Sequence, residues 1–116
     1  MTLDEQSRAS AIEDSEGRDL IRLYEAVAER CQSRDPEDYK REFLTTLAGL
    51  IAIGRLTVRL APSLTSGAPE SFESSDKIVD CLERHWPQHI SSDPYDVEML
   101  AFIESNCLIE WSSAPR

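Results

Sequence analysis

The residues best suited to chemistry are Cys81, His85 and His89, which are spaced four residues apart. On a helix the first two would share one face, as the ligands of a zinc site often do. Pro87 ends such a helix before the third residue can join them, because proline lacks a backbone N–H and clashes with the preceding turn. We therefore expect no metal site, and no cysteine nucleophile, because no group that would orient His85 is evident.

The other two cysteines, Cys31 and Cys107, fall on apolar helix faces. Three widely spaced cysteines do not form a disulfide framework and are typical of a reducing compartment, so we expect free thiols and a cytoplasmic location. The sequence contains no glycine-rich phosphate loop and none of the motifs GxSxG, HExxH or CxxC. We expect no cofactor and no enzymatic activity.

Charge is the strongest compositional signal, because the 116 residues carry a formal net charge of −10 at pH 7. An acidic surface repels the phosphates of nucleic acids and anionic lipids, so we expect no direct nucleic-acid ligand. The most apolar stretch, 43–60, contains arginines and threonines, so we expect no membrane span. The N-terminal residues lack a basic region followed by an apolar one, so we expect no signal peptide.

Apolar residues recur every three or four positions in four stretches, the period of one helix face. These stretches predict helices near 18–32, 36–53, 75–86 and 94–106. Asp35 and Pro36 suit the start of the second helix, and Gly54 suits its end. Asp93 and the proline after it repeat that start before the fourth helix, and Ser74 or Ser75 suits the N-cap of the third.

Two polar segments flank or interrupt these helices. Residues 1–17 predict a flexible acidic tail, whereas a capping-box pattern leaves a helix that begins at Ser10 as the alternative. Residues 62–74 are rich in serine, proline and glycine and predict a surface loop. The remainder, 18–116, is predicted to form a single domain.

One short segment favours a strand. Residues 56–60 alternate apolar and polar side chains, and they could pair with 108–111 as a ribbon. A continued helix for the first segment and an apolar coil for the second stay open. The predicted fold is therefore mostly α, a small four-helix domain with at most one two-stranded β ribbon.

The acidic residues are unevenly distributed: residues 1–17 carry a net charge of −4, residues 18–61 carry +1 and residues 62–116 carry −7. We expect an acidic face formed by the third and fourth helices and the loop before them. The alternative is an ordinary solvated surface whose acids match helix dipoles. Trp86 is a candidate aromatic anchor for a partner, although a place in the core suits it as well. The predicted partner-binding residues are Glu70, Glu73, Asp76, Asp80, Glu83, Trp86, Asp93, Asp96 and Glu98.

These features predict a protein-binding protein, an acidic inhibitor or neutraliser of a basic protein partner, such as an immunity protein, antitoxin or anti-defence inhibitor. The alternative is a helical adaptor, assembly subunit or cytosolic chaperone. Such a protein would self-associate as a homodimer through the small residues Ala48, Gly49 and Ala52. An enzyme with an unrecognised site is the third alternative. Salt dependence separates the first two, because ions screen a steered encounter more than an apolar contact.

Overall fold

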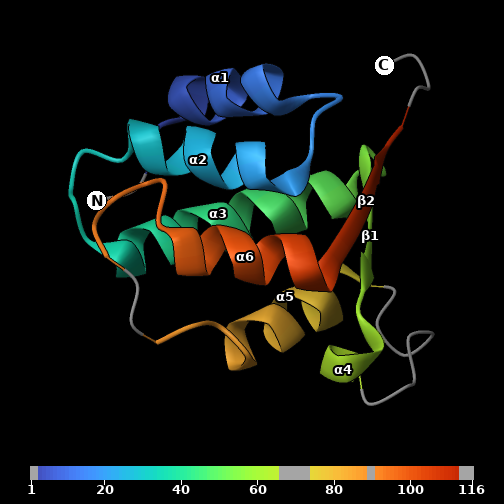
Figure 1. The fold of residues 1–116 in the computed structure, drawn as a ribbon. Coiled ribbons are helices and arrows are strands. Elements are labelled where there is room, and N and C mark those ends of the chain that lie inside the picture. Colours follow the sequence, from blue (N-terminus) through green and yellow to red (C-terminus); the bar gives the residue numbers. More distant parts are fainter. Residues whose placement is uncertain (1–2, 66–73, 89–90, 113–116) are drawn as a thin grey trace.

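The computed structural model describes residues 3–65, 74–88 and 91–112, which form six helices and two strands. The helices are α1 (Glu5–Ser15), α2 (Leu20–Arg30), α3 (Pro36–Ala52), α4 (Pro62–Thr65), α5 (Ser75–Arg84) and α6 (Val97–Asn106), and the strands are β1 (Leu56–Leu60) and β2 (Cys107–Trp111). α1 packs on α2, α2 on α3 and α3 on α5, and the ribbon stands at one end of this stack (Figure 1). The prediction of a mostly helical fold with one two-stranded ribbon is confirmed, with α1 and α4 added to the four expected helices.

The starts of α3 and α5 follow the capping rules read from the sequence. The Asp35 carboxylate accepts a hydrogen bond from the backbone N–H of Glu37 at 2.9 Å, and Pro36 occupies the first helical position. The Ser74 hydroxyl accepts one from the backbone N–H of Lys77 at 3.3 Å. α2, α3 and α5 lie inside their predicted ranges, up to two residues shorter at an end.

α3 ends in a Schellman motif at Gly54. This glycine has φ +78°, a left-handed conformation that glycine adopts at little cost. The backbone N–H of Arg55 donates to the C=O of Leu50 at 3.0 Å, and that of Gly54 donates to Ile51 at 3.1 Å. The turn releases the chain into β1.

The prediction of a flexible tail at 1–17 is wrong, because most of this segment forms α1. The helix starts earlier than the capping box at Ser10 suggested: the Asp4 carboxylate accepts a hydrogen bond from the backbone N–H of Ser7 at 2.7 Å. α1 contributes little apolar surface to the core: Ala11 is fully buried and Ile12 is partly buried against it. Hydrophobic periodicity therefore gave no sign of it, and polar contacts to α2 and α3 hold it in place.

α6 begins three residues later than the predicted residue 94. Asp96 is its N-cap, because its carboxylate accepts a hydrogen bond from the backbone N–H of Met99 at 3.1 Å. The carboxylate of Asp93, the expected cap, instead accepts a hydrogen bond from the backbone N–H of Tyr95 at 2.9 Å and closes a turn before the helix. The repeated Asp-Pro pattern thus starts a helix once and a turn once.

The core lies between α2, α3, α5, α6 and the ribbon. The apolar face predicted for α2 is buried and comprises Leu20, Leu23, Tyr24, Val27 and Cys31. The ring of Tyr24 lies 5.5 Å from that of Phe43, and the ring of Trp86 lies 5.8 Å from that of Phe102. Trp86 also lies close to Tyr24 and Phe43. This aromatic cluster joins α2, α3 and α6 to the end of α5.

β1 and β2 pair in antiparallel register, with Leu56 opposite Trp111 and Leu60 opposite Cys107. The strand interpretation of 56–60 is confirmed. Leu56, Val58 and Leu60 are buried, whereas the two side chains between them are exposed. This alternation attaches one face of the ribbon to the helices and leaves the other face in solvent.

Candidate protein-binding surface

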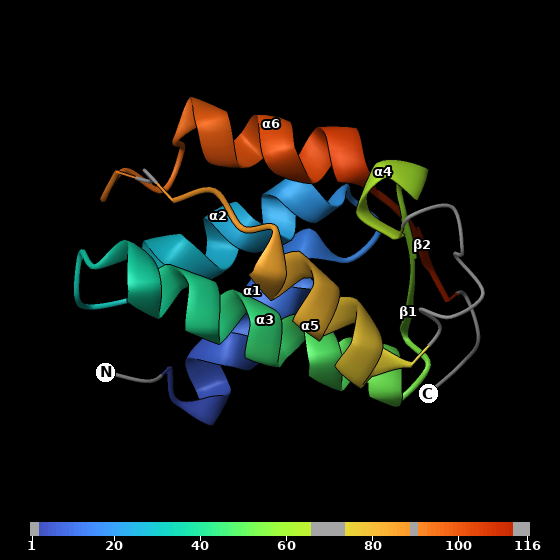
Figure 2. The same cartoon turned by 90° about the horizontal axis from the view of Figure 1, so that it is seen from below.

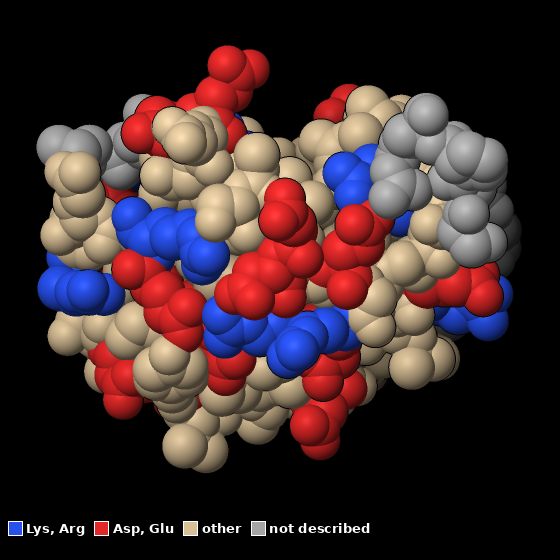
Figure 3. Space-filling view, turned by 90° about the horizontal axis from the view of Figure 1, so that it is seen from above, with Lys and Arg blue, Asp and Glu red and all other residues tan. Residues whose placement is uncertain are grey.

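On the α1 side of the molecule, acidic side chains are paired with arginines. Arg22 of α2 donates hydrogen bonds to Asp14 of α1, and to Glu25 and Glu29 of its own helix at 3.2 and 3.1 Å. The hydrogen bond from Arg22 lowers the pKa of Asp14 below its usual value. Figure 3 shows this side of the molecule, where basic side chains are bordered by acidic ones. Much of the charge on this face is therefore satisfied within the chain.

Two further ion pairs tie α1 to more distant elements. Arg8 reaches across to Glu42 of α3, whose side chain is only 2% exposed, and its Nε donates to the Thr46 hydroxyl at 3.0 Å. Glu16, just after α1, pairs with Arg55, just before β1. These two carboxylates are therefore held by arginines from other elements of the fold.

The acidic residues of α5 are arranged differently. Asp76, Asp80 and Glu83 are spaced four and three residues apart, which places them along one side of the helix, and we call them the α5 acidic stripe. The side chains of Asp80 and Glu83 are 65% and 56% exposed. Arg84 lies 3.0 Å from Asp80 as an exposed pair of small energy, and Lys77 is exposed on the same helix. α5 lies on the opposite side of the stack from α1 (Figure 2).

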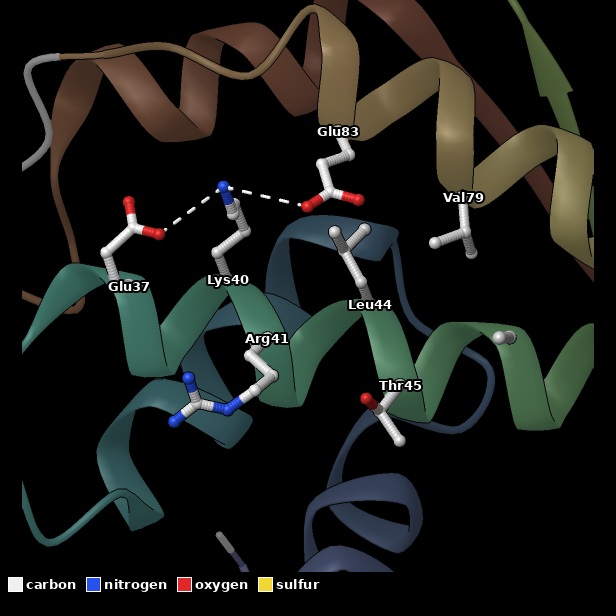
Figure 4. Close-up of a pocket in the computed structure, with 8 residues that line it drawn as sticks. Glu37, Lys40, Arg41, Leu44, Thr45, Val79 and Glu83 are labelled. Carbon is white, nitrogen blue, oxygen red and sulfur yellow. Dashed lines mark ion pairs between the residues drawn. The ribbon is translucent and has the colours of Figure 1, made fainter. Parts of the chain in front are cut away.

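A groove of about 480 Å³ lies between α3 and α5 beside this stripe. Its lining residues are Glu37, Lys40, Arg41, Leu44, Thr45, Ala48, Val79 and Glu83. Figure 4 shows Lys40 between Glu37 of α3 and Glu83 of α5, with its Nζ 3.4 and 4.0 Å from their carboxylate oxygens. Leu44 and Val79 supply an apolar wall from the two helices. The site can hold an aliphatic side chain next to a cation.

Asp93, Asp96 and Glu98 form a second acidic group, at the start of α6. They are separate from the α5 stripe because α5 packs on α3 whereas α6 packs on α2. Burial acts to raise the pKa of Asp96, but hydrogen bonds from Ser91 and the start of α6 outweigh it and lower this pKa. Asp93 and Asp96 thus have local structural roles, and Glu98 is exposed.

Three other predicted contact residues stand apart from these groups. Trp86 is half-buried, and its ring centroid lies 5.9 Å from that of Phe43 within the aromatic cluster, so a large part of the indole serves the core. Glu70 and Glu73 lie outside the described residues.

The cysteine and histidine of α5 do not form a reactive pair. Sγ of Cys81 lies 3.9 Å from Nδ1 of His85, but that nitrogen is 2.9 Å from the Cys81 carbonyl, and the thiol donates to the Leu64 carbonyl at 3.3 Å. Burial raises the pKa of Cys81 and raises that of Cys107 to about 12. His89 lies outside the described residues. Within 3–65, 74–88 and 91–112, no three His, Cys, Asp or Glu side chains gather as metal ligands do.

Sequence reasoning did not anticipate the grooves. Lys40 and Val79 are far apart in the sequence, and no local signal shows that their helices meet. A second groove, of about 550 Å³, lies between the start of α2, the end of α6 and β2. Beside it Leu108 is 71% exposed, and the Trp111 indole N–H donates to the Arg18 carbonyl at 2.7 Å.

No protein-family model, curated protein or solved structure matches this chain. None of the helices in the described part of the chain is long and apolar enough to cross a membrane. What the chain binds must therefore be inferred from the geometry and charge of its own surface.

Proposed function

We propose that this protein is a non-enzymatic binding protein whose α5 acidic stripe contacts a basic surface on a protein partner. The contrast between the two sides of the molecule carries the proposal. Near α1, the carboxylates of Asp14 and Glu42 pair with arginines of a neighbouring helix, and Glu42 is only 2% exposed. On α5, Asp80 and Glu83 are 65% and 56% exposed, and their ion pairs are looser: Asp80 pairs with the exposed Arg84 of the same helix, and Glu83 lies 4.0 Å from Lys40. Exposed charges of one sign raise the rate at which an oppositely charged partner associates.

Within this class, the proposal is a neutralising protein of the immunity, antitoxin or anti-defence type, which covers a basic active site or nucleic-acid channel of its partner. The small size and the net charge of −10 support this choice. A cytoplasmic location belongs to the same proposal.

The experiment compares two double variants that each remove two negative charges. Asp80→Asn/Glu83→Gln alters the α5 stripe, and Glu5→Gln/Glu13→Gln alters exposed residues of α1 that have no ion-pair partner among the described residues. Each protein is used to capture partners from the native host at low and at physiological ionic strength. We expect a basic protein that the wild type and the α1 variant retain and that the α5 variant captures less, chiefly through slower association at low salt.

Equal capture by both variants would show that charge placement does not determine binding. The acidic residues of α2 are unsuitable as controls, since Glu25 and Glu29 hold the guanidinium of Arg22 and their loss would disturb the fold.

Self-association through α3 is the second candidate. Gly49 and Ala52 are exposed, a Cβ built on Gly49 would meet no atom within 4 Å, and Ile53 is 69% exposed. Close approach of a second helix at this face is therefore sterically open. Light scattering tests it: a dimer that persists at high salt and is lost in Gly49→Gln would favour the adaptor function.

A further inference from the structure

The groove between α3 and α5 has an apolar part and a charged part side by side. Leu44, 5% exposed, lies in the wall on α3, with Ala48 one turn further on and Val79 opposite on α5. At the other end stand the carboxylates of Glu37 and Glu83, one on each helix. The groove thus resembles a socket for a side chain with an aliphatic body and a cationic neighbour.

Lys40 shows which chemistry the charged end accepts. Its ammonium lies 3.4 Å from Glu37 and 4.0 Å from Glu83, and its side chain is only 20% exposed. The two carboxylates are 73% and 56% exposed, so their outer sides stay open to solvent. One ammonium between two carboxylates leaves one negative charge unbalanced at this end, because the other lining cation, Arg41, is paired with Asp38. The chain places its own cation where a cation from outside would bind.

We propose that this groove binds a segment of the partner protein in which an arginine stands next to a leucine-like side chain. This inference rests on the proposed function and names the groove as the place where the partner binds. The aliphatic side chain packs on Leu44 and Val79, while the guanidinium bridges Glu37 and Glu83. Arginine suits this place better than lysine because its planar fork donates to two carboxylates at once.

Lys40 acts in this scheme as a built-in competitor. When the arginine arrives, the Lys40 ammonium must share the two carboxylates with it or move away. Lys40 therefore weakens the binding of any cationic side chain that has no adjoining apolar contact. A second copy of this chain is a poor occupant, since it carries the same net charge of −10 and the same acidic stripe.

The test uses two fluorescent synthetic helical peptides, one of leucine and arginine and one in which glutamine replaces each leucine. Anisotropy titrations at low and at physiological salt give their affinities. Lys40→Met, which keeps the stem and removes the charge, should tighten binding of the leucine–arginine peptide about threefold, the effect expected of one exposed ion pair. Lys77→Met is the matched control, because it removes one exposed positive charge from α5 outside the groove.

Ala48→Phe fills the apolar end and changes no charge. It should weaken the leucine–arginine peptide about tenfold, as expected when one leucine side chain stays in water, and leave the glutamine–arginine peptide unchanged. Thr45→Phe, at an exposed lining residue, repeats this test if Ala48→Phe does not fold.

The outcomes separate the two proposals. The groove is not the site if Lys77→Met tightens binding as much as Lys40→Met, or if the variants with a filled groove bind both peptides like the wild type. In either case, weaker binding by Asp80→Asn/Glu83→Gln would still support the acidic stripe. If that variant also binds normally, both proposals fail. A dimer in light scattering that Ala48→Phe abolishes would make a second copy the occupant and overturn the inference.

Discussion

The buried ion pair between α1 and α3 allows a prediction with a defined size. Arg8→Met removes the guanidinium and leaves the Glu42 carboxylate, 2% exposed, with only Nε of Arg41 at 4.0 Å among the described cations. Removing one partner of a buried pair costs about 3–5 kcal/mol, because the other charge stays buried and uncompensated. Arg8 is 27% exposed, so water can reach part of the vacated space. We therefore expect a loss of about 3 kcal/mol in the free energy of unfolding.

Urea unfolding followed by circular dichroism measures this loss, and a thermal scan should show a melting temperature lower by about 12 °C for a chain of this size. Arg84→Met is the control, since Arg84 and its partner Asp80 are 60% and 65% exposed. An exposed pair contributes about 1 kcal/mol or less.

A double variant tests the cause of the loss. Arg8→Met/Glu42→Met replaces the pair by apolar side chains and should recover most of the stability, because no charge is then left buried. If the double variant is as unstable as Arg8→Met, or if Arg8→Met costs no more than Arg84→Met, the stranded carboxylate is not what destabilises the protein.

Replacing the two glycines in and after α3 by alanine should act in opposite directions: Gly49→Ala, inside the helix with free space, should raise the stability by about 0.5–1 kcal/mol, and Gly54→Ala, at φ +78°, should lower it by about 1 kcal/mol. Thermal unfolding checks both changes in stability, and a change in the same direction for both variants would contradict these two backbone conformations. A hydrogen bond from α2 lowers the pKa of Asp14 in the folded state, so the stability it contributes is present above the unfolded value of 3.8 and is lost as the pH falls through the lower folded value. The amides of α1 should therefore lose hydrogen-exchange protection first on acidification below about pH 4, and equal loss in α1 and α3 would refute this order. Burial raises the pKa of the Cys31 and Cys107 thiols to about 11 and 12, so a thiol reagent at about pH 8 should modify them only after unfolding, and rapid reaction of the native protein would disprove their burial.

The start of α3, the end of α3 and the start of α5 were the most predictable parts of the fold, because they depend on residues that are close in sequence. Asp35 and Gly54 act on backbone groups within five positions. α1 was missed because its stability comes from contacts such as Arg8 with Glu42, which lie 34 positions apart. The polar side chains that fix it look like a solvated tail in the sequence.

The candidate site also has a part that could be predicted from the sequence and a part that could not. The spacing of Asp76, Asp80 and Glu83 sufficed to place them on one side of a helix, since helical geometry fixes their relative directions. The groove beside them was not predictable, because it exists only where α5 meets α3. Trp86 shows the intermediate case: its type suits both an interface and a core, and only its ring neighbours reveal how much of it the core takes up.

β1 is synthesised well before the strand that completes it. Leu56 pairs with Trp111 and Leu60 with Cys107, so α5 and α6 must leave the ribosome before the ribbon can close. Until then neither edge of β1 is paired with β2, and the buried side chains of this segment, Leu56, Val58 and Leu60, are all aliphatic. Such an edge can pair with other chains, and the charge of Arg59, the fourth of the five strand residues, opposes that pairing. A nascent chain that pauses before residue 107 should therefore be the species most prone to aggregate and most in need of a chaperone.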